Sequence, residues 1–222
     1  MSVVEAGPPR ARAIGVLLAG GQARRMGGGD KCLRHLADRP ILAHVIEKIR
    51  PQVDALVLNA NGDPARFDGF GLEVLPDVIE GFAGPLAGVL TGMEWAAVHR
   101  PDCRWIVTVA TDTPFLPADL VETMRAALRR DDAELACAVS NGRAHPVFGL
   151  WPVSLAPALR RAMVEEDIRK VDRFTERYRL AEAVFPVEPH DPFFNTNRPE
   201  DLDEAERLLA DHPRLGDRPS PA

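Results

Sequence analysis

The sequence is poor in features that mark several large classes of protein. It has only three cysteines, Cys32, Cys103 and Cys137, which are far apart and odd in number. Such a set fits neither a disulfide framework nor a zinc site, and it indicates reduced thiols in a cytoplasmic protein. No apolar run reaches the ~18 residues needed to span a bilayer. The first twelve residues also lack the apolar centre of a secretion signal, so we expect a cytoplasmic protein without a membrane segment.

Positive charge is also scarce. There are 27 Lys and Arg against 33 Asp and Glu, a formal net charge of −6, whereas duplex-binding modules are basic, so we expect no nucleic-acid partner. The 222 residues are 45% hydrophobic and 27% charged, which is ordinary for one globular domain. Since repeats and low-complexity linkers are missing too, we expect a single domain over residues 13–210. Residues 1–12 resemble a disordered lead-in, and residues 211–222 a flexible tail.

Between these tails, strand and helix patterns alternate. Short apolar runs predict buried strands at residues 13–18, 55–60, 72–75, 105–110, 134–139 and 147–150. Apolar residues at helical spacing predict helices at residues 41–49, 86–98, 118–130, 155–164, 171–178 and 199–209. This alternation predicts an α/β layered fold with a mostly parallel sheet. Ligands bind such sheets at the carboxyl ends of the strands, where the strand order reverses, so the loops after the strands are candidate sites.

The loop after the first strand, residues 18–31, reads LAGGQARRMGGGDK. Its glycines allow backbone N–H groups to approach phosphate oxygens, and two arginines and Lys31 supply positive charge. Two common phosphate motifs do not fit. A Walker A loop needs Gly before the lysine and Ser or Thr after it, but Asp30 and Cys32 flank Lys31, and the dinucleotide fingerprint is absent. A phosphate-binding loop of another kind is favoured over a flexible surface connection.

Asp112 directly follows the strand at residues 105–110. A carboxylate there, beside a phosphate loop, suits a magnesium ion, which prefers one or two carboxylates together with phosphates and water. The alternative is that Asp112 caps the following turn. The segment GPLAG at residues 84–88 is a helix start or a pocket for a flat ring, and its residues favour neither.

The segment FFNTNRPEDL places Asn195 and Asn197 at alternate positions before the last helix. Capping of that helix would explain Asn197 but not both asparagines. His145 suits a structural or a ligand role about equally, and the pair at residues 169–170 is read as a solvated face.

The motifs LAGGQARRMGGGDK, GPLAG, TDTPFLP and FFNTNRPEDL, in this order, closely resemble the molybdenum cofactor guanylyltransferase family of nucleotidyltransferases. The resemblance covers roughly residues 13–210, and the twin asparagines together with HPVFGL distinguish this family from the wider group. It implies a Rossmann-like, three-layer nucleotidyltransferase fold. The implied reaction transfers GMP from magnesium-bound GTP to the terminal phosphate of molybdenum-bound molybdopterin, with release of pyrophosphate. Thr111 departs from the family, which often has cysteine there.

The resemblance also implies roles for single residues. The residues matching the family's cofactor-binding and nucleotide-binding positions are Leu18, Ala19, Gly20, Gly21, Lys31, Asn59, Asp77, Asp112, Asn195 and Asn197. Within this set, Lys31 would hold the phosphates, and Asn59 and Asp77 would contact the guanosine. Asp112 matches the Mg²⁺-binding aspartate. Arg25, Asn195 and Asn197 match positions on the pterin side, and the implied catalytic residues are Lys31, Arg25 and Asp112.

Three other functions stay open. A molybdopterin cytidylyltransferase would have the same fold, although such enzymes resemble LAAG where this chain has LAGG. A sugar-1-phosphate nucleotidyltransferase is disfavoured by the twin asparagines. A non-catalytic carrier of the cofactor would not need a full set of phosphate and metal ligands, yet docking surfaces leave no short motif. Molybdoenzyme maturation proteins are therefore further candidate partners beside GTP and molybdopterin.

Overall fold

The computed structural model describes residues 13–19, 30–81 and 84–212, and these build a seven-stranded sheet. The strands stand in the order β5 (Glu73–Leu75), β4 (Ala55–Asn59), β1 (Ala13–Leu18), β6 (Trp105–Ala110), β8 (Arg143–Pro152), β7 (Leu135–Ser140) and β9 (Leu180–Phe185). All neighbours pair in parallel except β8, which is antiparallel to β6 and β7. The predicted mostly parallel α/β sheet is confirmed. Because the chain runs outward from β1 through β4 to β5 and then returns to β6, the strand order reverses between β1 and β6.

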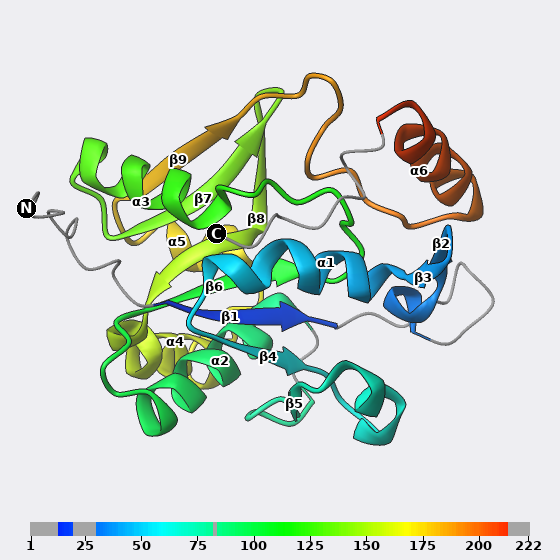
Figure 1. Cartoon of the computed structure of the whole chain (residues 1–222). Coiled ribbons are helices and arrows are strands. Elements are labelled where there is room, and N and C mark those ends of the chain that lie inside the picture. The colour runs from blue at the N-terminus through cyan, green and yellow to red at the C-terminus, as the bar shows by residue number, and fades with distance from the viewer. Residues whose placement is uncertain (1–12, 20–29, 82–83, 213–222) are drawn as a thin grey trace, which may run out of the picture.

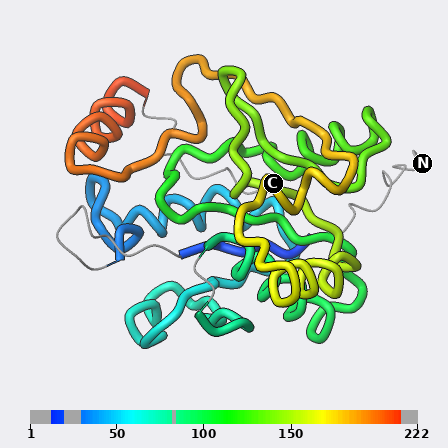
Figure 2. The backbone as a smooth tube through the Cα atoms, turned by 180° about the vertical axis from the view of Figure 1, so that it is seen from behind, coloured from blue at the N-terminus to red at the C-terminus, as the bar shows by residue number. Residues whose placement is uncertain are grey.

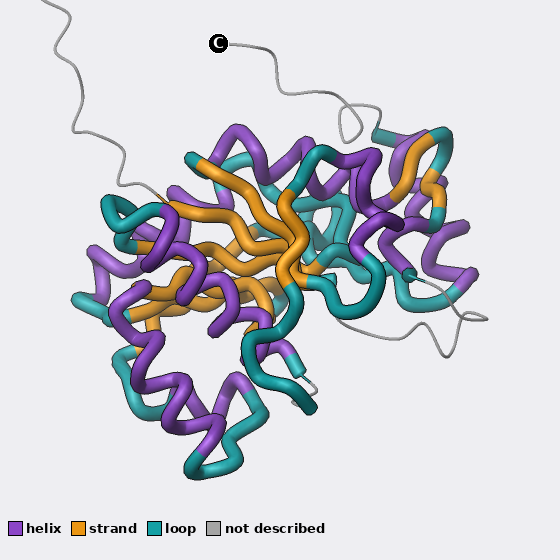
Figure 3. The backbone as a smooth tube through the Cα atoms, turned by 90° about the horizontal axis from the view of Figure 1, so that it is seen from below, coloured by secondary structure: helices purple, strands orange, loops and turns teal. Residues whose placement is uncertain are grey.

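Helices cover both faces of this sheet, which gives three layers (Figures 1 and 3). On one face, α1 (Ile41–Ile49) and α3 (Leu120–Asp131) bury their apolar sides, and α6 (Pro199–Asp211) contributes Ala205 to the same cluster. On the other face lie α2 (Pro85–His99), α4 (Ala156–Val164) and α5 (Val171–Thr175). The view from behind shows the same layers (Figure 2). Within the described ranges, no helix is long and apolar enough to cross a membrane.

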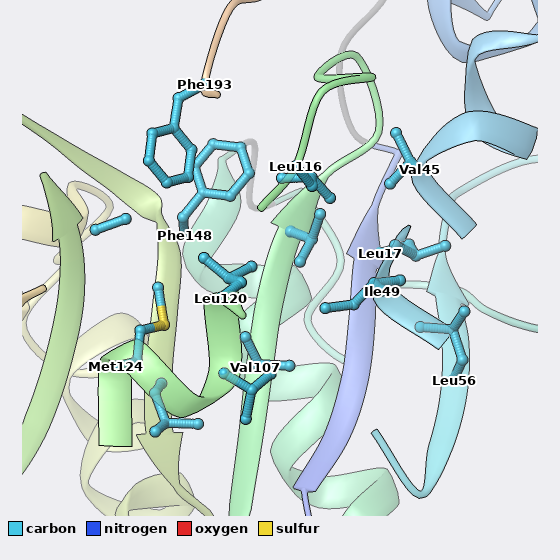
Figure 4. Packing of buried hydrophobic residues seen from close by; sticks show 14 of the residues in the cluster. Leu17, Val45, Ile49, Leu56, Val107, Leu116, Leu120, Met124, Phe148 and Phe193 are labelled. Carbon is cyan, nitrogen blue, oxygen red and sulfur yellow. The ribbon is translucent and has the colours of Figure 1, made fainter. Parts of the chain in front are cut away.

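Strand β1 lies in the middle of the core and contributes side chains to the hydrophobic clusters on both faces of the sheet. Leu17 packs with Val45 and Ile49 of α1, as Figure 4 shows, whereas Ile14 and Val16 belong to the cluster on the α2 face. Side chains alternate between the faces of a strand, so a strand buried on both sides needs an unbroken apolar run. That is the pattern AIGVLL, in which every residue is buried.

Several boundaries differ from those predicted. The prediction missed β9 (LAEAVF), because Ala and Glu are weak strand formers. Its buried and exposed residues alternate as in a strand with one covered face. Strand β8 spans residues 143–152 rather than 147–150, since its first half is polar and mostly exposed. Helix α5 ends at Thr175, and a short hairpin of β2 (His35–Leu36) and β3 (Arg39–Pro40) was not expected. Residues 1–12 and most of the predicted tail lie outside the described ranges.

Candidate active site

The ends of three central strands are joined at the point where the strand order reverses. The backbone N–H of Ala19, just after β1, donates to the carbonyl oxygen of Asn59 at the end of β4, at 3.0 Å. The Thr111 hydroxyl, just after β6, donates to the carbonyl oxygen of Leu18 at 3.3 Å. Figure 1 shows β1 and β4 ending on the side of the molecule where α6 and the β2–β3 hairpin lie. The predicted residues Gly20, Gly21 and Arg25 lie outside the described ranges.

Asp112 lies at this edge of the sheet, and its carboxylate faces Asn195. With its amide nitrogen turned toward the carboxylate, Asn195 donates to Oδ1 at 2.7 Å and to Oδ2 at 3.2 Å. Burial raises the pKa of Asp112, and the positive charge of Lys31 opposes that rise. The chain thus holds a carboxylate where its ionised form is costly unless a cation stands beside it. The Asp112 carboxylate interacts with the Asn195 amide and with the charge of Lys31. These interactions do not support the alternative that Asp112 only caps a turn.

The twin asparagines bracket a buried anchor. Thr196 is fully buried, and both its backbone N–H and its hydroxyl donate to the carbonyl oxygen of Asp112, at 3.0 and 2.9 Å. Asn195 therefore meets the Asp112 side chain, while two positions later the Asn197 Oδ1 accepts a hydrogen bond from Lys31 Nζ at 2.7 Å. The segment brings Lys31 and Asp112 to one site although they are far apart in the sequence.

The capping alternative for Asn197 is wrong. Arg198 is the N-cap residue of α6, and the Asp201 carboxylate accepts from the backbone N–H groups of Asn197 and Arg198 at 2.7 and 2.8 Å. Asp201 accepts hydrogen bonds from the backbone amides at the start of the helix. The Asn197 side chain is therefore not needed as a cap, and its Oδ1 accepts from Lys31 instead.

Asn59 and Asp77 are brought together at the ends of β4 and β5. Asn59 Nδ2 donates to Asp77 Oδ1 at 2.9 Å and to the carbonyl oxygen of Leu75 at 3.1 Å. Asn61, for which the sequence suggested no role, donates to Asp77 Oδ2 at 2.8 Å and accepts from the Asp77 backbone N–H at 2.9 Å. The Asp77 carboxylate is thereby held in one orientation, with lone pairs left on both oxygens.

Arg66 joins the Asn59–Asp77 pair to the Lys31 side of the site. Its Nε forms an ion pair with Asp30 Oδ2 at 2.6 Å, and its Nη2 donates to the carbonyl oxygen of Asn61 at 2.6 Å. The guanidinium also lies 4.8 Å from the ring centroid of Phe67. Sequence reasoning missed Arg66, because a single arginine in NGDPARF carries no motif.

A hollow of about 730 Å³ lies near the start of α2, where the carbonyl oxygen of Arg169 is 3.4 Å from the position that a Cβ on Gly84 would take. Its lining is mostly charged and comprises Asp167, Ile168, Arg169, Lys170, Arg173, Glu176 and Arg177. The pair Arg169–Lys170 therefore lines a concave surface, rather than only the solvated face expected from the sequence.

The residues around Asp112 suit magnesium better than a metal with an all-protein ligand set. Within the described ranges, no three His, Cys, Asp or Glu side chains are grouped as metal ligands. Magnesium is commonly held by one or two carboxylates, with substrate phosphates and water completing its shell. A single carboxylate whose ionised form needs a cation fits that description.

The fold indicates the class of protein. The mostly parallel sheet with one antiparallel strand and helices on both faces is that of nucleotidyltransferases, and its switch point brings together one carboxylate, one lysine and two asparagines. Residues 15–184 match the family model described as the MobA-like NTP transferase domain, and the chain belongs to that family.

Relatives in this family agree with the resemblance seen in the motifs. The proteins named molybdenum cofactor guanylyltransferase from Bradyrhizobium sp. (strain ORS 278) and Rhodopseudomonas palustris (strain BisB5) are 60% and 58% identical to this chain. The matches cover 88% and 87% of this chain and 92% of each relative. The crystal structure of molybdopterin-guanine dinucleotide biosynthesis protein A from Archaeoglobus fulgidus shares the fold. Its TM-score is 0.69 at 23% identity, over 89% of this chain and 99% of that one. The predicted family, fold class and enzyme class are confirmed.

Proposed function

We propose that this nucleotidyltransferase transfers GMP from magnesium-bound GTP to the terminal phosphate of molybdenum-bound molybdopterin, giving the guanine dinucleotide and pyrophosphate. The observation that carries the proposal is the meeting of Asp112, Lys31 and the twin asparagines at one edge of the sheet. The names of the relatives, molybdenum cofactor guanylyltransferase, favour the same reaction.

The nucleotide would bind across the ends of β1, β4 and β5. In this proposal Leu18, Ala19, Gly20 and Gly21 line the nucleotide and Lys31 neutralises its phosphates, while Asp77 accepts hydrogen bonds from the guanosine. Two features support this arrangement. Asn59 and Asn61 hold the Asp77 carboxylate in one orientation, and Arg66 ties Asn61 to Asp30, the residue before Lys31. A carboxylate that is already held in place binds its hydrogen-bond donor better than a mobile one, because less conformational freedom is lost on binding.

Asp112 would hold Mg²⁺ together with the phosphates of GTP. A bound magnesium ion would supply charge neutralisation for the pyrophosphate that leaves. The chain itself would keep the Asp112 carboxylate ionised and hold it in one orientation. The Asn195 amide and the charge of Lys31 favour the ionised form. The raised pKa of the carboxyl is the cost of holding this group in a site from which water is partly excluded.

The chemistry needs no general base from the chain. A phosphate monoester is already ionised near neutral pH, so an oxygen of the acceptor phosphate can attack the α-phosphorus of GTP directly. The bond from that phosphorus to the β-phosphate oxygen breaks, and pyrophosphate leaves. Two anions must be brought together, so positioning and charge neutralisation supply most of the rate. Lys31 would serve the nucleotide, while Arg25, Asn195 and Asn197 would face the acceptor.

Product analysis tests this proposal. The purified chain is mixed with molybdenum-loaded molybdopterin, Mg²⁺ and either GTP or CTP. We expect the guanine dinucleotide and pyrophosphate from GTP only. Product from CTP alone would make the chain a cytidylyltransferase, and nucleotide binding without product would favour a cofactor carrier. We further propose that the enzyme works in the cytoplasm, which the three buried cysteine thiols favour. Handover to molybdoenzyme maturation proteins stays a prediction.

A further inference from the structure

A buried hydrogen-bonded cluster lies at the start of the segment that carries the twin asparagines. Ser140, the last residue of β7, is 1% exposed, and its Oγ donates to Asp191 Oδ1 at 2.9 Å. The same Oγ lies 2.7 Å from Nε2 of the half-buried His145. Only three residues lie between Asp191 and Asn195, so Asp191 links the cluster along the chain to the group that faces Asp112.

The donors and acceptors of this cluster fit together in one way. A serine hydroxyl has one proton, and a carboxylate only accepts, so the Ser140 proton goes to Asp191. His145 must then donate from Nε2–H to Ser140 Oγ. Burial lowers the pKa of His145, and the neighbouring Asp191 opposes this while Arg143 adds to it. The ring is therefore neutral at neutral pH, with its hydrogen on Nε2 and a bare Nδ1.

The same three residues hold the start of the segment in place. Asp191 Oδ1 also accepts from the backbone N–H of Phe193 at 2.9 Å, and the His145 ring stacks on Phe193 with 4.6 Å between centroids. Phe193 is 4% exposed and also packs against Phe148, as Figure 4 shows. The far end is held at Thr196 by the carbonyl oxygen of Asp112. Asn195 lies between these two anchors.

We propose that His145 and Ser140 are positioning residues for molybdopterin, the substrate that accepts the GMP group. Through Asp191 and Phe193 they hold residues 191–197 so that Asn195 faces Asp112 and Asn197 meets Lys31. This inference rests on the proposed function, in which the asparagines face the acceptor. Leu18, Ala19, Asn59 and Asp77, which line the nucleotide in that function, come from other elements. Lys31 and Asp112 contact the segment but lie outside it, so loss of the cluster should affect the molybdopterin acceptor more than GTP.

The test compares variants that keep or lose the donor to Ser140. His145→Leu and Ser140→Ala break the cluster, whereas the amide nitrogen of His145→Gln is a donor that can replace Nε2–H. A misplacement of about 1 Å costs up to about a hundredfold in rate, so we expect kcat/KM for molybdopterin to fall about tenfold or more in the first two variants. The Kd for GTP should change by less than about threefold, and His145→Gln should recover most of the loss.

Thr108→Val is the matched control. Thr108 is also a fully buried hydroxyl; it donates to the carbonyl oxygen of Val147 at 2.6 Å and accepts from Trp151 Nε1 at 2.9 Å. Its hydrogen-bond partners, Val147, Gly149 and Trp151, all lie on β8 and outside residues 191–197. This variant should lower the Tm yet keep the wild-type kcat/KM. If His145→Leu likewise lowers only the Tm, the cluster is merely structural and the inference is wrong.

A spectroscopic measurement keeps the inference separate from the proposed function. Nitrogen-15 NMR of the wild-type chain should show His145 as the neutral Nε2–H tautomer, and Ser140→Ala should change its ring-nitrogen shifts. A ring that carries its hydrogen on Nδ1 would overturn the inference whatever the activity. A wild-type chain that forms no guanylylated product refutes the proposed function instead. An active wild type whose His145→Leu variant keeps its acceptor KM and kcat overturns the inference alone.

Discussion

Two glycines on α2, Gly88 and Gly92, allow a test of the nucleotide site with a built-in control. They lie one turn apart on the side of the helix that packs against β1. A Cβ on Gly92 would stand 2.5 Å from Val16 Cγ2, in the core. A Cβ on Gly88 would stand 2.5 Å from Leu18 Cδ2 and closer still to Asn59 Oδ1. Both substitutions to alanine force neighbouring atoms to move, but only Gly88→Ala displaces residues proposed to bind GTP.

The expected stability losses are similar. Overpacking costs about 1–3 kcal/mol, and the better helix propensity of alanine returns up to about 1 kcal/mol. Both variants should fold with a lower Tm. The Asn59 side chain cannot move aside without breaking the hydrogen bonds that its Nδ2 donates to the Leu75 carbonyl oxygen and to the Asp77 carboxylate. We therefore expect Gly88→Ala to lose about 1.4 kcal/mol of GTP binding, which is a tenfold higher Kd.

Isothermal titration of GTP into the wild type and both variants measures this difference, and thermal melts report the stability. Gly92→Ala should bind GTP as the wild type does. Wild-type GTP affinity in both variants would refute the reasoning, because Asn59 and Leu18 would then not line the nucleotide. A tenfold loss in both would show that the effect is spread through the fold.

Three further predictions concern single side chains. Burial raises the pKa of Asp112, so the stability from this carboxyl is present below its usual value of 3.8 and is lost as the pH rises through the raised folded value. Asp112→Asn should therefore raise the Tm at pH 7, though not below pH 3.8, while abolishing turnover; a lower Tm in calorimetry at pH 7 would contradict this. Lys31→Ala should weaken GTP binding about tenfold or more, since a charge-assisted phosphate contact is lost, and an unchanged Kd in titration would count against its role. Burial raises the pKa of Cys32 and Cys137 to about 11, so iodoacetamide at pH 8 should label these thiols only in urea, as mass spectrometry would show.

The sequence predicted the central part of the fold well because its patterns are strong there. An apolar run such as AIGVLL suits only an element buried on both sides, and β1 is that element. The edge strand β9 was missed because it includes weak strand formers and because Leu180 and Val184 on its exposed face are apolar, so the sequence itself does not alternate. Pairing across the sheet, which no local pattern reveals, makes this segment a strand.

The candidate site was likewise predicted in part. Asp112 and Lys31 were predicted because they follow strands in motifs with recognisable chemistry. Arg66 and Asn61 were not given site roles, since each works through partners distant in the sequence, such as Asp30 for Arg66. For His145, a structural and a ligand role were both left open. The alternate spacing of Asn195 and Asn197 argued correctly against capping. It could not show that Thr196 between them is bonded to Asp112.

The central claim is that GTP and its metal bind between Lys31, Asp112 and the Asn59–Asp77 pair. A crystal structure with Mn²⁺ and a non-hydrolysable GTP analogue tests it most directly, because the anomalous signal locates the metal. The account predicts manganese bound to the Asp112 carboxylate and to the phosphates, with Lys31 on the phosphates and the guanosine at Asp77. Manganese or the triphosphate bound elsewhere, for instance in the hollow lined by Arg169 and Lys170, would contradict it.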